Sequence, residues 1–141
     1  MLVDLGKCKM VKCAYVVLLV LLTSSYSFGQ VPVRQEQEVR RAWKLLLAQM
    51  QTGTLAATKE LMTDAAFASL TQGVKATEYA EALRRFSRQN KQEPVTVQVI
   101  SPTEAIVEVG QLDVEAGFYL SEFDFEYQAG KWLLVAFYPN K

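Results

Sequence analysis

The chain has 141 residues, with 15 Lys plus Arg against 15 Asp plus Glu, two cysteines and no histidine. This length suits a single domain, and the zero formal net charge lacks the basic excess typical of nucleic-acid-binding proteins. Without histidine, the chain alone cannot provide Ser-His-Asp or Cys-His catalysis, or histidine-ligated zinc. We therefore expect no nucleic-acid partner and no cofactor.

The N-terminal segment has the order of a secretory signal peptide. Lys7, Lys9 and Lys12 precede an apolar run at residues 14–22, and small and polar residues follow as far as Gly29. The run is shorter than the about 20 residues that a membrane-spanning helix needs. We predict cleavage after Gly29, so that residues 1–29 are a signal peptide and residues 30–141 form one exported domain, periplasmic or secreted and free of the membrane. An uncleaved membrane anchor is the alternative.

Both cysteines precede the apolar run, at Cys8 and Cys13. Cleavage would remove them and leave a mature domain without a disulfide, although an exported protein can form one. The true start is either Met1 or Met10, because Lys12 still provides a basic segment after the second methionine.

Residues 33–51 have the periodicity of a long amphipathic helix. Its apolar residues recur at steps of three and four: Val39, Ala42, Trp43, Leu46, Leu47 and Met50. Glu36 and Glu38 are expected in its first turn, and Gly53 in the left-handed conformation that ends it. Thr54 is expected to cap a shorter helix that reaches Met62, whereas residues 65–70 suit a helical turn or a short strand.

A third helix is expected after Gly73, with Thr77 as its N-cap. Its apolar face carries Tyr79, Leu83 and Phe86. Six basic residues of the first and third helices would form an anion-binding strip if they came together: Arg40, Arg41, Lys44, Arg84, Arg88 and Lys91. The other interpretation is a solvated face that keeps the helices soluble.

After Pro94 the period changes to two, which is typical of strands. Strands are expected around Val95 to Val99, around Ala105 to Val109, between loops at residues 115–117 and 128–131, and over residues 131–138. On the third strand, Tyr119, Ser121, Phe123, Phe125 and Tyr127 are expected to face inward, and Phe118, Leu120, Glu122, Asp124 and Glu126 outward.

The expected fold is α+β, with three N-terminal helices packed on a curved antiparallel sheet of four to five strands. This order resembles the nuclear transport factor two-like superfamily, which includes ketosteroid isomerase and polyketide-cyclase-like proteins. The resemblance rests on the mid-helix Trp43, a second helix that ends near residues 61–63, and a closing strand that begins Gly-Lys-Trp-Leu-Leu at Gly130. It implies a cone-shaped domain of an exported bacterial type. The cystatin fold shares the plan, but three helices fit it poorly.

The resemblance also implies a pocket between the sheet and the helices, into which the enzymes of the superfamily direct carboxylate and Tyr groups. The strand face expected inward has no acid, so we assign no catalytic residue. Seven aromatic residues would either line a pocket for a small apolar ligand or fill the core: Trp43, Phe67, Tyr79, Tyr119, Phe123, Phe125 and Trp132.

Glu122, Asp124 and Glu126 are expected to form a solvated acidic stripe on the outer face. Binding a cation together with Glu108 is the alternative, but no loop supplies the carbonyl ligands that calcium sites use, so we expect no metal. A shift of one residue in register would turn these acids inward and make them acid-base candidates.

The last strand is apolar on both faces, which predicts that both are covered. We expect a homodimer or partner interface on the outer face, through Phe118, Leu120, Leu133, Val135 and Phe137. Cover by the protein's own loops is the alternative.

Two function classes follow from these patterns. The first is an exported non-catalytic binding or interaction module, and the second is a small isomerase, dehydratase or hydrolase acting in the pocket. A cavity with a buried Asp or Glu beside a Tyr would favour the enzyme.

Overall fold

The computed structural model describes residues 31–113 and 117–139, and it describes their side chains except at positions 31, 32, 111–113 and 117–119. The predicted signal peptide, with Cys8 and Cys13, therefore lies outside the described residues. The chain divides into two compact units, residues 1–34 and 35–141, and the description that follows concerns the second. Among the described helices, none combines the length and the apolarity needed to cross a bilayer.

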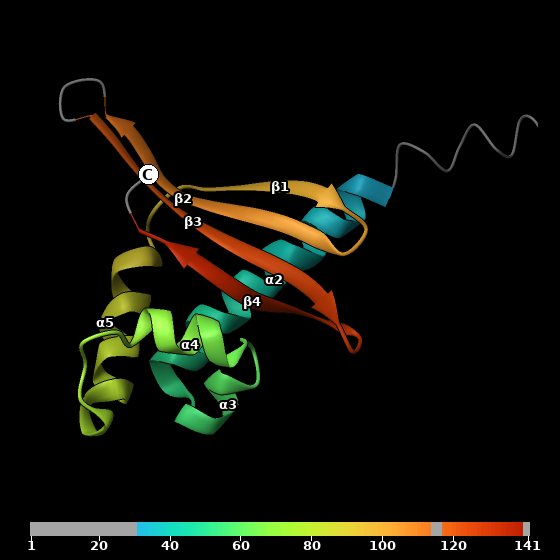
Figure 1. Cartoon of the computed structure of the whole chain (residues 1–141). Coiled ribbons are helices and arrows are strands. Elements are labelled where there is room, and N and C mark those ends of the chain that lie inside the picture. The colour runs from blue at the N-terminus through green and yellow to red at the C-terminus, as the bar shows by residue number, and fades with distance from the viewer. Residues whose placement is uncertain (1–30, 114–116, 140–141) are drawn as a thin grey trace, which may run out of the picture. The chain divides into compact units, whose positions relative to one another are not determined.

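Helices occupy the first half of the described chain and strands the second (Figure 1). The helices are α2 (Val31–Thr52), α3 (Leu55–Lys59), α4 (Asp64–Leu70), the 3-10 helix η1 (Ala76–Glu78) and α5 (Tyr79–Asn90). The strands are β1 (Val95–Ser101), β2 (Glu104–Asp113), β3 (Gly117–Gln128) and β4 (Lys131–Tyr138). They form one antiparallel sheet in the order β1-β2-β3-β4. The predicted α+β class is confirmed, and residues 64–70 are helical rather than extended.

The side-chain caps agree with the sequence at one position and differ at another. Thr54 caps α3, as predicted, by accepting a hydrogen bond from the Ala57 N–H at 3.2 Å. Thr63 caps α4 in the same way, with the Ala66 N–H at 3.2 Å. The predicted cap at Thr77 is wrong, because Thr77 lies inside η1 and α5 begins without a side-chain cap.

Two expectations for the ends of α2 are also wrong. The helix begins at Val31, so Glu36 lies beyond the first turn. There its carboxylate accepts a hydrogen bond from Arg40 Nε at 2.9 Å, a contact between successive helical turns. Gly53 has no positive φ. A Cβ at Gly53 would lie 2.7 Å from the carbonyl oxygen of Gln49, so this position favours glycine because of close packing.

A β-bulge in β4 reverses the alternation of its side chains. Phe125 pairs with Leu134, whereas Asp124 pairs with Ala136, so Val135 is an extra residue on β4. Beyond the bulge, Phe137 therefore lies on the same face as Leu134 and packs against the core. The prediction that Phe137 faces outward is wrong for this reason.

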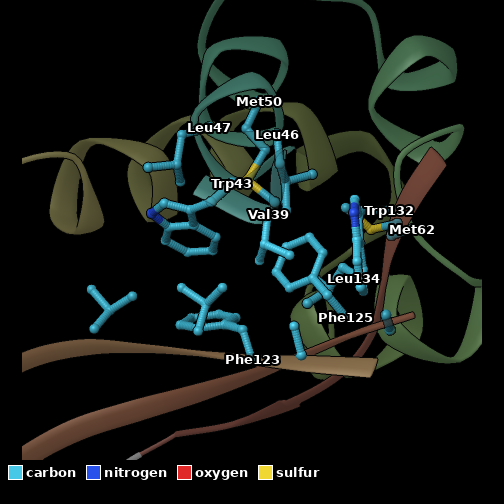
Figure 2. Close-up of a cluster of buried hydrophobic side chains, with 14 of the residues drawn as sticks. Val39, Trp43, Leu46, Leu47, Met50, Met62, Phe123, Phe125, Trp132 and Leu134 are labelled. Atoms are coloured by element: carbon cyan, nitrogen blue, oxygen red, sulfur yellow. The ribbon is translucent and has the colours of Figure 1, made fainter. Parts of the chain in front are cut away.

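The core lies between α2 and the sheet (Figure 2). Trp43 points from the helix toward β3, where the centroids of its ring and of the Phe123 ring are 4.6 Å apart. The predicted apolar stripe of α2 is confirmed by its buried members, which are Val39, Trp43, Leu46, Leu47 and Met50. On α5, Leu83 is buried and Tyr79 and Phe86 are partly buried against this core, also as predicted.

Candidate functional site

A cavity of about 410 Å³ lies between α2, α5 and the start of β1. Its volume falls within the range of about 300–1,000 Å³ that is usual for small-molecule sites. Ten residues line it: Trp43, Lys44, Leu47, Ala48, Gln51, Thr52, Ser87, Asn90, Lys91 and Val95. The residues from α2 form two adjacent rows on the surface of the helix. Within each row, successive residues are four positions apart, which places them about one helical turn apart.

The wall of the cavity is largely apolar. Trp43 and Leu47 are buried, with exposed fractions of 2% and 7%. Ala48 adds a small exposed side chain and Val95 a half-buried one. Because Ala48 and Val95 leave room beside the Trp43 ring, this surface suits an apolar group.

The polar side of the cavity has two amides and two hydroxyls, from Gln51, Asn90, Thr52 and Ser87. The buried Ser87 hydroxyl donates to the Leu47 carbonyl oxygen at 2.8 Å and contacts Gln51 Oε1 at 3.3 Å. Asn90 Nδ2 donates to the Phe86 carbonyl oxygen at 2.9 Å. The Asn90 bond leaves its Oδ1 as an acceptor for a bound group, and Gln51 adds a second amide to the lining.

The charged residues that line the cavity are both lysines. Lys44 comes from α2 and Lys91 directly follows α5, and both side chains are exposed. Neither lysine forms an ion pair with any residue in the described part of the chain. The lining includes no Asp, Glu or Tyr.

Three of the other four basic residues of the predicted strip pair with acids, and the fourth, Arg41, is exposed and does not line the cavity. Arg40 pairs with Glu36 at 2.9 Å and donates to the Val95 carbonyl oxygen at 3.0 Å. Arg84 and Arg88 both pair with Glu81, at 3.4 and 2.9 Å. The pKa of the Glu81 carboxyl group is lowered, mainly by the hydrogen bond from Arg88 and secondly by the one from Arg84. The strip is therefore divided: Arg40, Arg84 and Arg88 pair with acids, while Lys44 and Lys91 line the cavity.

The aromatic residues predicted to line a pocket are mostly packed in the core. Phe67, Phe123, Phe125 and Trp132 are buried there together with Trp43, and of these Trp43 also lines the cavity. The partly buried Tyr79 ring meets Phe67 edge to face, with centroids 5.3 Å apart. The side chain of Tyr119 lies outside the described residues.

The acids of β3 alternate with the buried Phe123 and Phe125, and so lie on the opposite, outer face of the sheet. Glu108 pairs across the strands with Glu122, and Glu104 with Glu126. A hollow of about 250 Å³ on this face is lined by nine residues: Ile100, Glu104, Ala105, Ile106, Glu122, Asp124, Phe125, Glu126 and Val135. No group of His, Cys, Asp or Glu within the described ranges is arranged to hold a metal ion.

Because of the bulge, the residues of β4 that were predicted to form an interface do not all lie on the same face of the sheet. Leu133 and Val135 are half-buried, and Val135 lines the outer hollow. Leu120 is also half-buried, and the side chain of Phe118 lies outside the described residues. Phe137 stacks on Phe123 on the inner face.

The polar lining of the cavity was not predicted from the sequence. One signal was present: Ser87 interrupts the apolar face of α5 four residues after Leu83, where a buried polar side chain needs a hydrogen-bond partner. That Lys44 and Lys91 line the same cavity has no such signal, because it depends on how α2 and α5 pack.

Comparison with protein-family models gives no match for this chain, and comparison with curated proteins gives none either.

Proposed function

We propose that the chain is an exported, non-catalytic binding module that holds a small ligand in the cavity between α2 and α5. The proposal includes the cone-shaped fold of the nuclear transport factor two-like superfamily and cleavage of the leader after Gly29. The observation that carries it is the lining of the cavity, with Trp43, Leu47, Ala48 and Val95 on the apolar side and amides and lysines opposite.

The composition of the lining favours binding over catalysis. An isomerase, dehydratase or hydrolase of the expected kind would place a carboxylate or a phenol within hydrogen-bond reach of the substrate. The carboxylates of β3 lie on the other face of the sheet, and the half-buried Tyr79 packs on Phe67. The cavity instead offers an apolar wall and fixed amides, which suit retention of a ligand.

Filling the cavity provides a direct test. Ala48 is exposed and lines the cavity, so Ala48→Trp should occupy it without disturbing the buried core. Ala68→Trp places the same ring at an exposed position of α4, away from the cavity, and serves as the matched control. The neutral fluorescent probe N-phenyl-1-naphthylamine would report binding to the exported protein.

We expect saturable binding to the wild type, roughly tenfold weaker binding to Ala48→Trp, and unchanged binding to Ala68→Trp. If the wild type shows no saturable binding, or if both variants bind as the wild type does, the cavity is not a ligand site. Intact-mass measurement of the same exported protein tests the leader: a mass that includes residues before Gln30 would refute cleavage after Gly29.

A second candidate function is docking of a protein partner on the outer face of the sheet. Ile100 is 57% exposed, and with Ile106 and Val135 it borders carboxylates in the hollow there. In a two-fold homodimer this face would meet itself and oppose carboxylates to carboxylates. Charge complementarity therefore favours a partner protein that presents Lys or Arg beside apolar side chains.

Light scattering at high micromolar concentration separates the two assemblies on this face. If the outer face binds a basic partner, we expect the protein alone to stay monomeric at neutral pH and low salt. A dimer that Val135→Lys disrupts would instead support the homodimer, and would refute docking of a basic partner there.

A further inference from the structure

We infer that the ligand of the cavity between α2 and α5 is an amphiphile with an anionic head and an apolar body, and that Lys44 and Lys91 hold its head. This inference rests on the proposed binding function of the cavity. It goes further by naming the charge and shape of the ligand.

Positive charge is left without an acidic partner among the residues that line the cavity. Of the arginines in the same helices, Arg40 pairs with Glu36, and Arg84 and Arg88 share Glu81. Lys44 and Lys91 have no such partner within the part of the chain that the structure describes, and no acid belongs to the lining. Two cations beside a low-dielectric apolar wall favour an anion and disfavour a cation.

The charged residues and the apolar wall of the cavity differ in their exposure to water. Lys44 and Lys91 are exposed, whereas Trp43 and Leu47 are buried. A ligand would therefore meet water and positive charge at one end and apolar surface at the other. This polarity excludes a small hydrophilic anion, which would gain nothing from the Trp43 ring, and suits an alkyl chain or a similar apolar body.

The terminal carbonyl groups of α5 carry partial negative charge that opposes an anion. One of these groups is engaged, because the Lys91 N–H donates to the Ser87 carbonyl oxygen at 3.0 Å. Two full lysine charges exceed the remaining half charge of the helix end. Gln51 adds a neutral amide on the α2 side of the cavity.

The test compares ligands that share a chain and differ in the head group. Isothermal titration calorimetry of the exported protein would use decanoate, decyl phosphate and decanol. We expect at least one of the two anions to bind roughly tenfold more tightly than decanol, and we expect added salt to weaken anion binding alone. Whichever anion binds more tightly identifies the head as carboxylate or phosphate.

Lysine variants then locate the head. Lys44→Gln and Lys91→Gln should each weaken anion binding by about threefold to tenfold while decanol binding stays unchanged. Lys75→Gln is the matched control, because Lys75 is an exposed lysine that lies outside the cavity.

The outcomes separate this inference from the function on which it rests. If decanol binds as tightly as both anions, or if Lys44→Gln and Lys91→Gln keep the full anion preference, the inference is overturned while the cavity remains a binding site. If none of the three ligands binds and the neutral naphthylamine probe also fails, the proposed function itself is wrong.

Discussion

The ring of Phe137 lies on the ring of Phe123, with centroids 4.9 Å apart and an angle of 18° between the planes. Phe86 of α5 meets both rings edge to face, at 5.8 Å from Phe123 and 5.7 Å from Phe137. The bulge at Val135 makes this contact possible, because it returns Phe137 to the inner face. The far end of β4 is therefore part of the core.

We expect Phe137→Ala to lower the free energy of unfolding by about 2–3 kcal/mol, less than for a fully buried Phe because the side chain is partly exposed. Ile100→Ala, at a side chain that is 57% exposed, should change it by less than about 1 kcal/mol. Urea unfolding of both variants measures the difference. Equal effects would mean that Phe137 does not pack against the core.

Thr63 joins a helix cap to the sheet. Its hydroxyl accepts from the Ala66 N–H at 3.2 Å and donates to the Val135 carbonyl oxygen at 3.4 Å. We expect Thr63→Ala to cost about 1–2 kcal/mol in unfolding free energy, and Thr63→Ser to restore most of it. Thr54→Ala, which removes the exposed cap of α3, should cost less. A larger loss at Thr54 in urea unfolding would contradict the coupling to the sheet.

The turn between β3 and β4 holds Ala129 in a backbone conformation that is unfavourable for alanine. Ala129 and Gly130 have φ values of +49° and +83°, as both central residues of a type I′ hairpin turn require. Asn adopts this conformation more readily than Ala, so Ala129→Asn should raise the unfolding free energy by up to about 1 kcal/mol. Gly130→Ala should lower it by about 1 kcal/mol. Thermal unfolding checks both, and a stabilising Gly130→Ala would contradict the assigned turn.

The ion pairs of Glu81 make the stability of the protein depend on pH. Arg88 and Arg84 lower the pKa of its carboxyl group in the folded state, so the ion pairs contribute stability at neutral pH and lose it as the pH falls through that lowered pKa. We expect Glu81→Gln to be less stable than the wild type at pH 7 and to match it in strong acid. Carboxyl NMR titration should show the pKa of Glu81 rising toward its ordinary value in Arg88→Gln, whereas Arg85→Gln is the control.

The sequence predicts those features that depend on the local period of apolar residues. The buried stripe of α2 and the inward Phe123 and Phe125 follow from regular periods of 3.6 and two. The orientation of Phe137 does not, because the single extra residue Val135 reverses the alternation and leaves no mark in the composition of β4.

The candidate site is less predictable than the fold for a related reason. Lys44 belongs to a helix whose apolar stripe is evident, and Lys91 to the end of another, but their shared cavity exists only once α2 and α5 have packed. Acids in the same helices engage three arginines of the strip, one with Glu36 and two with Glu81, and the lysines that line the cavity are not among them. The sequence suggests a basic strip without showing this selection.

The isolated bridge between Met62 and Leu134 protects an edge of the sheet against aggregation. The Leu134 N–H donates to the Leu61 carbonyl oxygen, and the Thr63 N–H donates to the Leu134 carbonyl oxygen, so the segment before α4 occupies backbone groups that an edge strand would otherwise expose. On the opposite edge, Arg40 occupies the Val95 carbonyl oxygen. Both measures leave fewer sites at which another chain could add a strand and begin a fibril.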